Sequence, residues 1–178
     1  GDEPANVIKM KTRTIGRSIQ NPGIMLPKVG GGKLGWHYQQ IINMWSANNN
    51  KLDGSVRNNV KTIYDPSPVG FKVPDAHAFM GFSTTGAVWS NGYTFKVDND
   101  KEIYFQAGGA RYGTSGALTA NGIVGFYWQS VPKPDGAGSL GFGYRTSMKD
   151  GTIATINSPA TDDLGSYANG YGVRPVAE

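Results

Sequence analysis

The stretch Tyr64–Pro74 reads Y-D-P-S-P-V-G-F-K-V-P and places three prolines and one glycine within eleven residues. Each proline fixes its own φ and biases the preceding residue toward extended backbone, so this stretch cannot form a helix. The Asp-Pro and Ser-Pro pairs favour a rigid turn, and the glycine relieves it by adopting a positive φ. We therefore interpret this stretch as a structural motif, whose main residues are Asp65, Pro66, Pro68, Gly70 and Pro74.

Two helices are expected, one on each side of this turn. Trp36–Trp45, W-H-Y-Q-Q-I-I-N-M-W, groups its large apolar side chains at roughly helical spacing. Asp75 follows the last proline and is a good N-cap for a short helix ending at Met80. Ahead of both, Ala5–Ser18 alternates apolar or threonine positions with basic ones, which predicts a half-buried strand.

Short strands separated by turn residues are expected through the rest of the chain. Val124–Val131, V-G-F-Y-W-Q-S-V, is the most apolar of them and predicts a core position for Trp128. Asn91-Gly92 is a typical hairpin turn. The other expected strands or short turn-bounded segments are Phe71–Val73, Val88–Val97, Glu102–Ala107, Leu118–Gly122, Ser139–Thr146, Thr152–Ile156 and Gly170–Val176.

Composition limits the class of protein. The chain has 178 residues, of which 26 are glycine, 17% are charged and 11% are aromatic, which is typical of an ordered domain with short strands and long loops. We expect a single domain over 1–178, with an N-terminal strand segment in 1–20. No apolar run approaches the roughly 18 residues of a membrane helix. Gly1-Asp2-Glu3 is typical of a trimmed end, and we expect a signal or lipoprotein anchor to have preceded it.

The net charge of +4 is concentrated in the first third of the chain. A basic stripe is compatible with nucleic-acid binding. A solvated strand face explains it better, because no recognition helix, zinc spacing or aromatic RNA-binding signature accompanies it. We therefore expect no nucleic-acid partner. The stripe comprises Lys9, Lys11, Arg13, Arg17, Lys28, Lys33 and Lys51.

Catalytic and metal-binding chemistry have little support in the sequence. Cysteine is absent, which excludes disulfides, zinc–cysteine sites and thiol nucleophiles. His37 and His77 are the two imidazoles, and they lack the spacing of a metal-ligand pair. Lys133-Pro134-Asp135 offers a lone carboxylate where a hard cation needs several oxygens. We expect no enzymatic activity, no metal and no cofactor.

Five separated motifs occur in the order known from one family. Tyr64–Pro74 resembles Y-D-P-C-P-x-G-[WFY]-x-V-P, the signature of the major paralogous domain (FISUMP-type) family. The later motifs also resemble it, and coverage runs from about Asn21 to the end. They are F-Q-A-G-G-A-R-Y at Phe105–Tyr112, the segment at Gly116–Leu118, G-F-Y-W-Q-S at Gly125–Ser130, and G-Y-G-V-R-P-V at Gly170–Val176. Ser67 stands where the family usually has cysteine, so any role of that cysteine is lost here.

The resemblance implies a fold, a location and a kind of partner. Members of the family are bacterial surface proteins and lipoproteins that often accompany fimbrillin-like proteins. Their fold is similar to that of C-type lectins and formylglycine-generating enzymes. We therefore expect an α+β domain of C-type-lectin-like architecture, with two helices, short antiparallel sheets, long glycine-rich loops and a last strand beside the first. The cysteine-dependent chemistry of formylglycine-generating enzymes is not carried over.

The expected binding surface lies on the two long polar loops of the second half, Pro132–Gly138 and Asn157–Asn169. Loops held by rigid strands concentrate functional contacts, and tyrosine and asparagine suit adaptable binding. The alternatives are that these loops are solvated connections and that the tyrosines fill the core. The candidate ligand-binding residues are Asp135, Tyr144, Asn157, Asp162, Asp163 and Tyr167.

Taken together, these observations predict a non-enzymatic adhesion or ligand-binding domain at the bacterial cell surface or outer membrane. The expected ligand is a glycan or a protein, and other fimbrial or surface subunits are expected partners. The second hypothesis is a structural subunit of a pilus or surface layer. A degenerate relative of the formylglycine-generating enzymes is the third.

Overall fold

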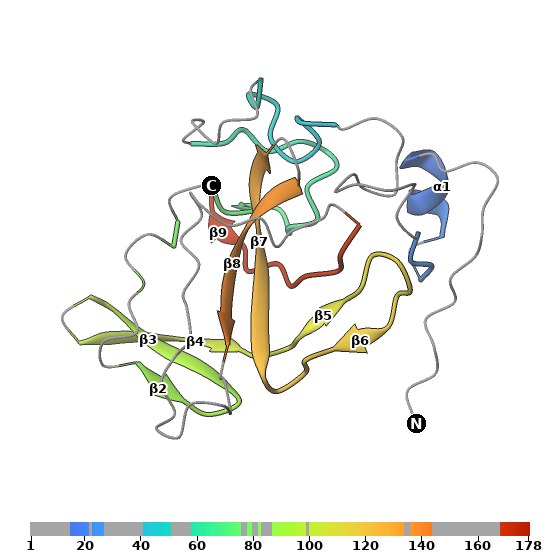
Figure 1. The fold of residues 1–178 in the computed structure, drawn as a ribbon. Helices are drawn as coiled ribbons and strands as arrows, with labels where there is room; N and C mark the ends of the chain where they lie inside the picture. The colour runs from blue at the N-terminus through green and yellow to red at the C-terminus, as the bar shows by residue number, and fades with distance from the viewer. Residues whose placement is uncertain are drawn as a thin grey trace.

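The computed structural model describes residues 15–21, 23–26, 41–50, 58–75, 78–79, 82, 87–98, 100–133, 136–143 and 168–178. Within these ranges the chain is mostly β, with four separate antiparallel sheets and one helix of six residues (Figure 1). In the same ranges, no helix has the length and apolar character needed to cross a membrane.

The sheets are small. In three of them the paired strands follow one another in the sequence, whereas the β1–β9 sheet pairs strands that are far apart in the sequence. β1 pairs with β9, β2 with β3 and β3 with β4, β5 with β6, and β7 with β8. The elements are α1 (Ile15–Gln20), β1 (Phe71–Lys72), β2 (Val88–Trp89), β3 (Gly92–Asp98), β4 (Lys101–Gln106), β5 (Ala110–Arg111), β6 (Leu118–Thr119), β7 (Val124–Lys133), β8 (Gly136–Gly143) and β9 (Val176–Ala177).

The prediction of an α+β domain with two helices and C-type-lectin-like architecture is wrong. Ile41–Trp45, the described half of the first predicted helix, forms turns and bends. The residues that follow are bonded to distant parts of the chain instead: Asn49 donates a side-chain hydrogen bond to the Ser130 carbonyl in β7 (2.6 Å), and Ala47 N–H donates to the Val60 carbonyl (2.8 Å). These long-range bonds hold the segment in a compact loop, so tertiary contacts override its weak helical periodicity.

The second predicted helix, from Asp75 to Met80, is also absent from its described part. The Asp75 carboxylate accepts a hydrogen bond from the Asn58 backbone N–H (3.3 Å), and Ala78 N–H donates to the Asp75 carbonyl (3.4 Å) in a single turn. The side chain that was expected to cap a helix is therefore bonded to a neighbouring loop, and residues 78–79 form a turn.

The strand predicted over Ala5–Ser18 is wrong in its described part, because Ile15–Ser18 belongs to the helix α1. The rest of that prediction lies outside the described residues. The predicted terminal strand Gly170–Val176 is reduced to β9 at Val176–Ala177. Its partner is β1 rather than an N-terminal strand, with Phe71 opposite Ala177. The last segment of the chain thus returns to the proline-rich turn.

The proline-rich turn has the structural role predicted for it. Gly70 has a φ of 80°, which confirms the expected positive value. The buried Asp65 carboxylate accepts hydrogen bonds from the backbone N–H groups of Ser67 (2.8 Å) and Val73 (2.9 Å), so one side chain ties both ends of the turn. Lys61 Nζ completes the turn by donating to three carbonyls, those of Ser67 (2.9 Å), Pro68 (2.6 Å) and Phe71 (2.5 Å).

An aromatic core lies against the β2–β3–β4 sheet. Phe79, Tyr93, Phe95, Phe105 and Ala107 form its buried cluster. The hairpin predicted at Asn91-Gly92 is confirmed, since β2 and β3 pair antiparallel across this turn and Asn91 has a positive φ of 52°. Aromatic side chains therefore form the core on this sheet.

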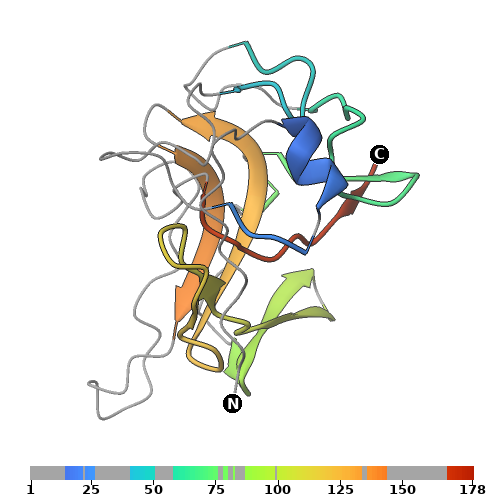
Figure 2. The same ribbon diagram turned by 90° about the vertical axis from the view of Figure 1, so that its right-hand side faces the viewer.

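β7 and β8 form a long bent ribbon (Figure 2). The strands expected over Val124–Val131 and Ser139–Thr146 are confirmed in their described parts, and they pair with each other, although β8 begins earlier, at Gly136. The register shifts between Trp128 and Pro132, an irregularity that bends strands. The loop predicted over Pro132–Gly138 is wrong in extent, because both strands continue into it and only residues 134–135 separate them.

Candidate functional site

The segment Gly170–Gly172 is inserted between β5 and β7. Arg111 and Gly170 exchange two backbone hydrogen bonds of 2.9 Å each, which joins the segment to β5. Gly172 N–H donates to the Phe126 carbonyl (3.0 Å), and the Gly172 carbonyl accepts from Trp128 N–H (2.9 Å), which joins it to β7. The segment therefore links the β5–β6 sheet to the β7–β8 sheet, which are also joined by a β-bridge between Gly109 and Gly125.

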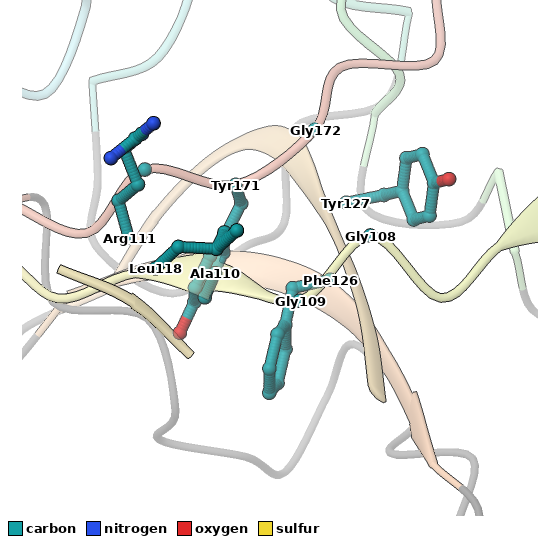
Figure 3. Close-up of a pocket in the computed structure, with 10 residues that line it drawn as sticks. Gly108, Gly109, Ala110, Arg111, Leu118, Phe126, Tyr127, Tyr171 and Gly172 are labelled. Carbon is teal, nitrogen blue, oxygen red and sulfur yellow. The ribbon is translucent and has the colours of Figure 1, made fainter. Parts of the chain in front are cut away.

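Side chains alternate between the two faces of this junction. A Cβ at Gly170 would lie 3.1 Å from the Arg111 Cβ, and one at Gly172 would lie 3.1 Å from the Tyr127 Cε1. The two glycines thus belong to the same face as the side chains of Arg111 and Tyr127. Figure 3 shows these two side chains projecting away from the side on which the rings of Phe126 and Tyr171 lie.

A cleft of about 360 Å³ opens at this junction, and we name it the glycine cleft. Its walls come from four separate parts of the chain: β5 and the residues before it, β6, β7 and the inserted segment (Figure 3). Because glycine has no side chain, the backbone itself forms much of the lining and is open to close approach by a ligand. The lining residues are Gly108, Gly109, Ala110, Arg111, Leu118, Phe126, Tyr127, Gly170, Tyr171 and Gly172.

Arg111 supplies the positive charge of the cleft. Its Nη1 donates to the Gly116 carbonyl (3.0 Å), which orients the guanidinium, and the side chain is exposed. Among the described lining residues it is the one ionised side chain. The cleft therefore presents a fixed cation at one end.

Tyr127 supplies an aromatic ring. Its ring packs edge-on against Phe105, with centroids 4.9 Å apart, and its hydroxyl donates to the Gln106 carbonyl (2.9 Å). Burial raises the pKa of the Tyr127 phenol, although the Gln106 bond and the nearby Arg174 partly oppose this effect. The ring is thus held neutral and fixed against the aromatic core, while part of it remains exposed.

The opposite face of the junction is an aromatic stack. The Tyr171 ring lies 4.7 Å from Phe126 and 4.3 Å from Trp128, centroid to centroid, and Trp45 meets Trp128 edge-on at 6.3 Å. Trp128 is only 6% exposed, which confirms the predicted core position. Through the Tyr171 ring, this stack holds the inserted segment against β7 and so positions Gly170 and Gly172 on the other face.

Tyr171 is also held through its hydroxyl. Asn169 Nδ2 donates to the Tyr171 hydroxyl (3.0 Å), and Asn169 Oδ1 accepts from Gly113 N–H (3.0 Å). Burial raises the pKa of the Tyr171 phenol above its ordinary value of 10.0, with a further contribution from Tyr112, while the Asn169 bond acts in the opposite direction.

Alkaline titration should reveal this burial. Because the pKa of Tyr127 and Tyr171 is raised in the folded state, their contribution to stability is complete below pH 10 and is lost as the pH rises through the folded-state values. We expect the free energy of unfolding, measured in urea, to fall above pH 10. The double variant Tyr127→Phe/Tyr171→Phe should have a shallower slope, and Tyr64→Phe, which removes an exposed phenol, is the control. Equal slopes in all three proteins would contradict the prediction.

Gly109, which forms a β-bridge with Gly125 of β7, has a positive φ and no room for a side chain. Its φ is 67°, and a Cβ would lie 2.1 Å from the Thr119 carbonyl oxygen and 2.8 Å from the Asn121 nitrogen. Gly122 has a similar φ of 75°, but no atom lies within 4 Å of its Cβ position. The two positions therefore separate the cost of a positive φ from the cost of a steric clash.

Gly109→Ala and Gly122→Ala form a matched pair. In both variants the free energy of unfolding should fall by about 1–2 kcal/mol, because alanine is strained in a left-handed conformation. Gly109→Ala should lose about 1–3 kcal/mol more, because the clash is with backbone atoms that cannot rotate away. Chemical denaturation measures both values, and equal losses would mean that the backbone around Gly109 moves aside freely.

The six ligand-binding residues predicted from the sequence lie outside the described residues. They are Asp135, Tyr144, Asn157, Asp162, Asp163 and Tyr167. His37 and His77 lie outside as well. In the part of the chain that the structure describes, no group of three or more histidine, cysteine, aspartate or glutamate side chains is arranged to hold a metal ion.

The cleft was not predicted, although its residues belong to motifs visible in the sequence. Four of the five family-like motifs contribute to its lining: Phe105–Tyr112, Gly116–Leu118, Gly125–Ser130 and Gly170–Val176. The signal was the pair of glycines in G-G-A-R and the G-Y-G alternation, because a glycine leaves its backbone uncovered by a side chain. Comparisons of this chain with protein-family models, with curated proteins and with solved structures find no match.

Proposed function

We propose that this chain is a non-enzymatic ligand-binding domain of the bacterial cell surface and that it binds its ligand in the glycine cleft. The observation that supports this most is the construction of the cleft: an exposed backbone floor between a fixed guanidinium and a fixed phenol ring. Small-molecule sites combine such an open cavity with a few oriented polar groups. The resemblance of the motifs to a family of surface proteins supports the location.

Binding is favoured over catalysis by the chemistry of the lining. The described side chains of the cleft provide one guanidinium, that of Arg111, and one phenol, that of Tyr127, while the Tyr171 ring lies in the stack on the opposite face; both phenols have a raised pKa. General acid–base catalysis near neutral pH needs a group that titrates near the working pH. These phenols stay protonated there, so they serve as hydrogen-bonding groups rather than as proton carriers.

Substitutions in the floor of the cleft provide the test. No atom lies within 4 Å of the Cβ position at Gly108, so Gly108→Ala adds a methyl group to the cleft without a clash. Gly172→Ala adds another, beside the Tyr127 ring. Because the methyl groups take space that a ligand needs, each should weaken binding about tenfold or more.

The measurement is binding of the soluble domain to a glycan array, followed by titration with the sugars retained. Gly23→Ala is the control, since Gly23 is exposed, has no neighbour at its Cβ position and lies outside the cleft. Wild-type affinity in both Gly108→Ala and Gly172→Ala would place the binding site elsewhere on the domain.

A structural subunit of a fimbria or surface layer is the second candidate, and one observation favours it. Ile63 is 91% exposed and directly precedes the proline-rich turn, and Val69 is 97% exposed within the turn that Asp65 and Lys61 hold. Rigid, exposed apolar side chains are common at protein contacts. Concentration-dependent assembly that Ile63→Ser and Val69→Ser abolish, with no ligand binding in the cleft, would favour this function.

A further inference from the structure

We infer that the glycine cleft selects a sugar that carries a carboxylate, a uronic or nonulosonic acid residue, and that Arg111 recognises this carboxylate. The inference rests on the proposed function and adds to it the class of ligand. It follows from the charge of the cleft, from the hydrogen bonding of its strands and from the shape of its floor.

The charge of the cleft favours an anion. Arg111 is exposed and is the one ionised side chain among the described lining residues, so no carboxylate of the cleft neutralises it. The hydrogen bond from Nη1 to the Gly116 carbonyl uses one of five N–H donors and orients the guanidinium. A guanidinium that is already oriented binds a carboxylate through two parallel hydrogen bonds at a low entropic cost.

The backbone of the cleft does not suit an extended peptide. Strand addition needs a row of unpaired backbone groups along one edge of a sheet. β5 pairs with β6 on one edge, where Ala110 lies opposite Thr119, and Arg111 is bonded to Gly170 on the other edge. The inserted segment is in turn bonded to β7 through Gly172. A ligand is therefore recognised by its own ring and substituents rather than by main-chain pairing.

The floor and the far wall suit a pyranose ring. The exposed backbones of Gly108, Gly170 and Gly172 let a ring approach closely, and the ring of Tyr127 offers an apolar surface beside a polar hydroxyl. Aromatic rings pack against the apolar faces of sugars while hydroxyl groups around the sugar form hydrogen bonds. A volume of about 360 Å³ lies at the small end for ligand sites, which limits the part of the ligand held inside the cleft to one or two rings.

Matched pairs of sugars test the selection of charge. Trigalacturonic acid is compared with its methyl ester, which keeps the rings and removes the charge, and 3′-sialyllactose is compared with lactose. The affinity of the intact domain is measured by isothermal titration calorimetry at low and physiological salt. We expect at least one acid to bind about tenfold or more tightly than its neutral partner, since hydrogen bonds to charged groups have this magnitude. The pair that shows the preference identifies the type of acid.

Variants of Arg111 test its role. Arg111→Gln should abolish the preference for the acid and leave the affinity for the neutral sugar nearly unchanged. Arg111→Lys keeps the charge but loses the planar pair of donors, so it should lose part of the preference. Lys96→Gln removes an exposed charge outside the cleft and should keep the full preference. Melting temperatures show whether each variant is folded. If Arg111→Gln does not fold, Arg111→Lys alone tests whether Arg111 recognises the carboxylate.

The outcomes separate this inference from the proposed function. Equal binding of the acids and their neutral partners, weakened by Gly108→Ala, would overturn the inference and leave the cleft as the binding site. A preference for the acid that survives in Arg111→Gln and Arg111→Lys would also overturn it. If none of the four probes binds, the inference fails, and the glycan array with Gly108→Ala then decides whether the proposed function fails too.

Discussion

Replacing Phe105 with alanine is expected to lower the free energy of unfolding by about 3–5 kcal/mol. Phe105 is 1% exposed and lies at the centre of the aromatic core. Its ring contacts those of Phe79, Phe82, Phe95 and Tyr127 at centroid distances of 4.9–6.0 Å, and the Arg174 guanidinium lies 5.0 Å above it. The truncation removes all of these contacts and leaves a cavity that surrounding rings cannot fill.

Urea denaturation measures this loss, with Tyr104→Ala as the matched control. Tyr104 is the neighbouring aromatic residue of β4, is 42% exposed and donates its hydroxyl to the carbonyls of Ser90 and Asn91. Its removal should cost much less than that of Phe105. A similar loss for both variants would mean that the buried cluster is not the main source of stability.

Trp128→Ala is expected to have an effect of the same size, about 3–5 kcal/mol, through a different part of the molecule. The indole is buried between Tyr171 and Trp45, so its loss leaves the inserted segment without the ring that supports it. Trp128→Phe keeps an aromatic ring and should recover a large part of the stability. Because the floor of the cleft lies on this stack, ligand affinity should fall together with stability.

Phe105→Ala and Trp128→Ala should differ in their effect on the near-ultraviolet circular dichroism of the aromatic stack beneath the cleft. The near-ultraviolet circular dichroism of Trp128→Ala should lose the contribution of the Trp128–Tyr171 pair, while Phe105→Ala should keep it. A Trp128→Ala protein with wild-type stability and wild-type affinity would show that the stack is not what holds the inserted segment.

Features set by neighbouring residues could be predicted from the sequence. The positive φ of Gly70, the hairpin at Asn91-Gly92 and the buried position of Trp128 all follow from turn chemistry or from apolar runs within a few residues. The turn at Asp65-Pro66 was predicted as well, whereas the two backbone hydrogen bonds that the Asp65 carboxylate accepts were not.

Features set by distant residues could not be predicted. Asp75 has the chemistry of a helix cap, yet its carboxylate is bonded to Asn58 in another loop. Ile41–Trp45 has apolar side chains at helical spacing, yet it forms turns and bends, and the residues that follow it are bonded to the distant Ser130 and Val60. The cleft depends on the pairing of Arg111 with Gly170 and of Tyr127 with Gly172, and nothing in the local sequence specifies either partner.

The insertion of Gly170–Gly172 between β5 and β7 has a consequence for how the molecule is assembled. The hairpins β3–β4 and β7–β8 join residues that are close in sequence and can form early, because short loops close at low entropic cost. The partners of Gly170, Gly172 and β9 lie far back along the chain, so these pairings close large loops and come late. A partly folded chain can therefore contain both hairpins and still have no cleft, and the ability to bind a ligand is gained only when the final segment docks.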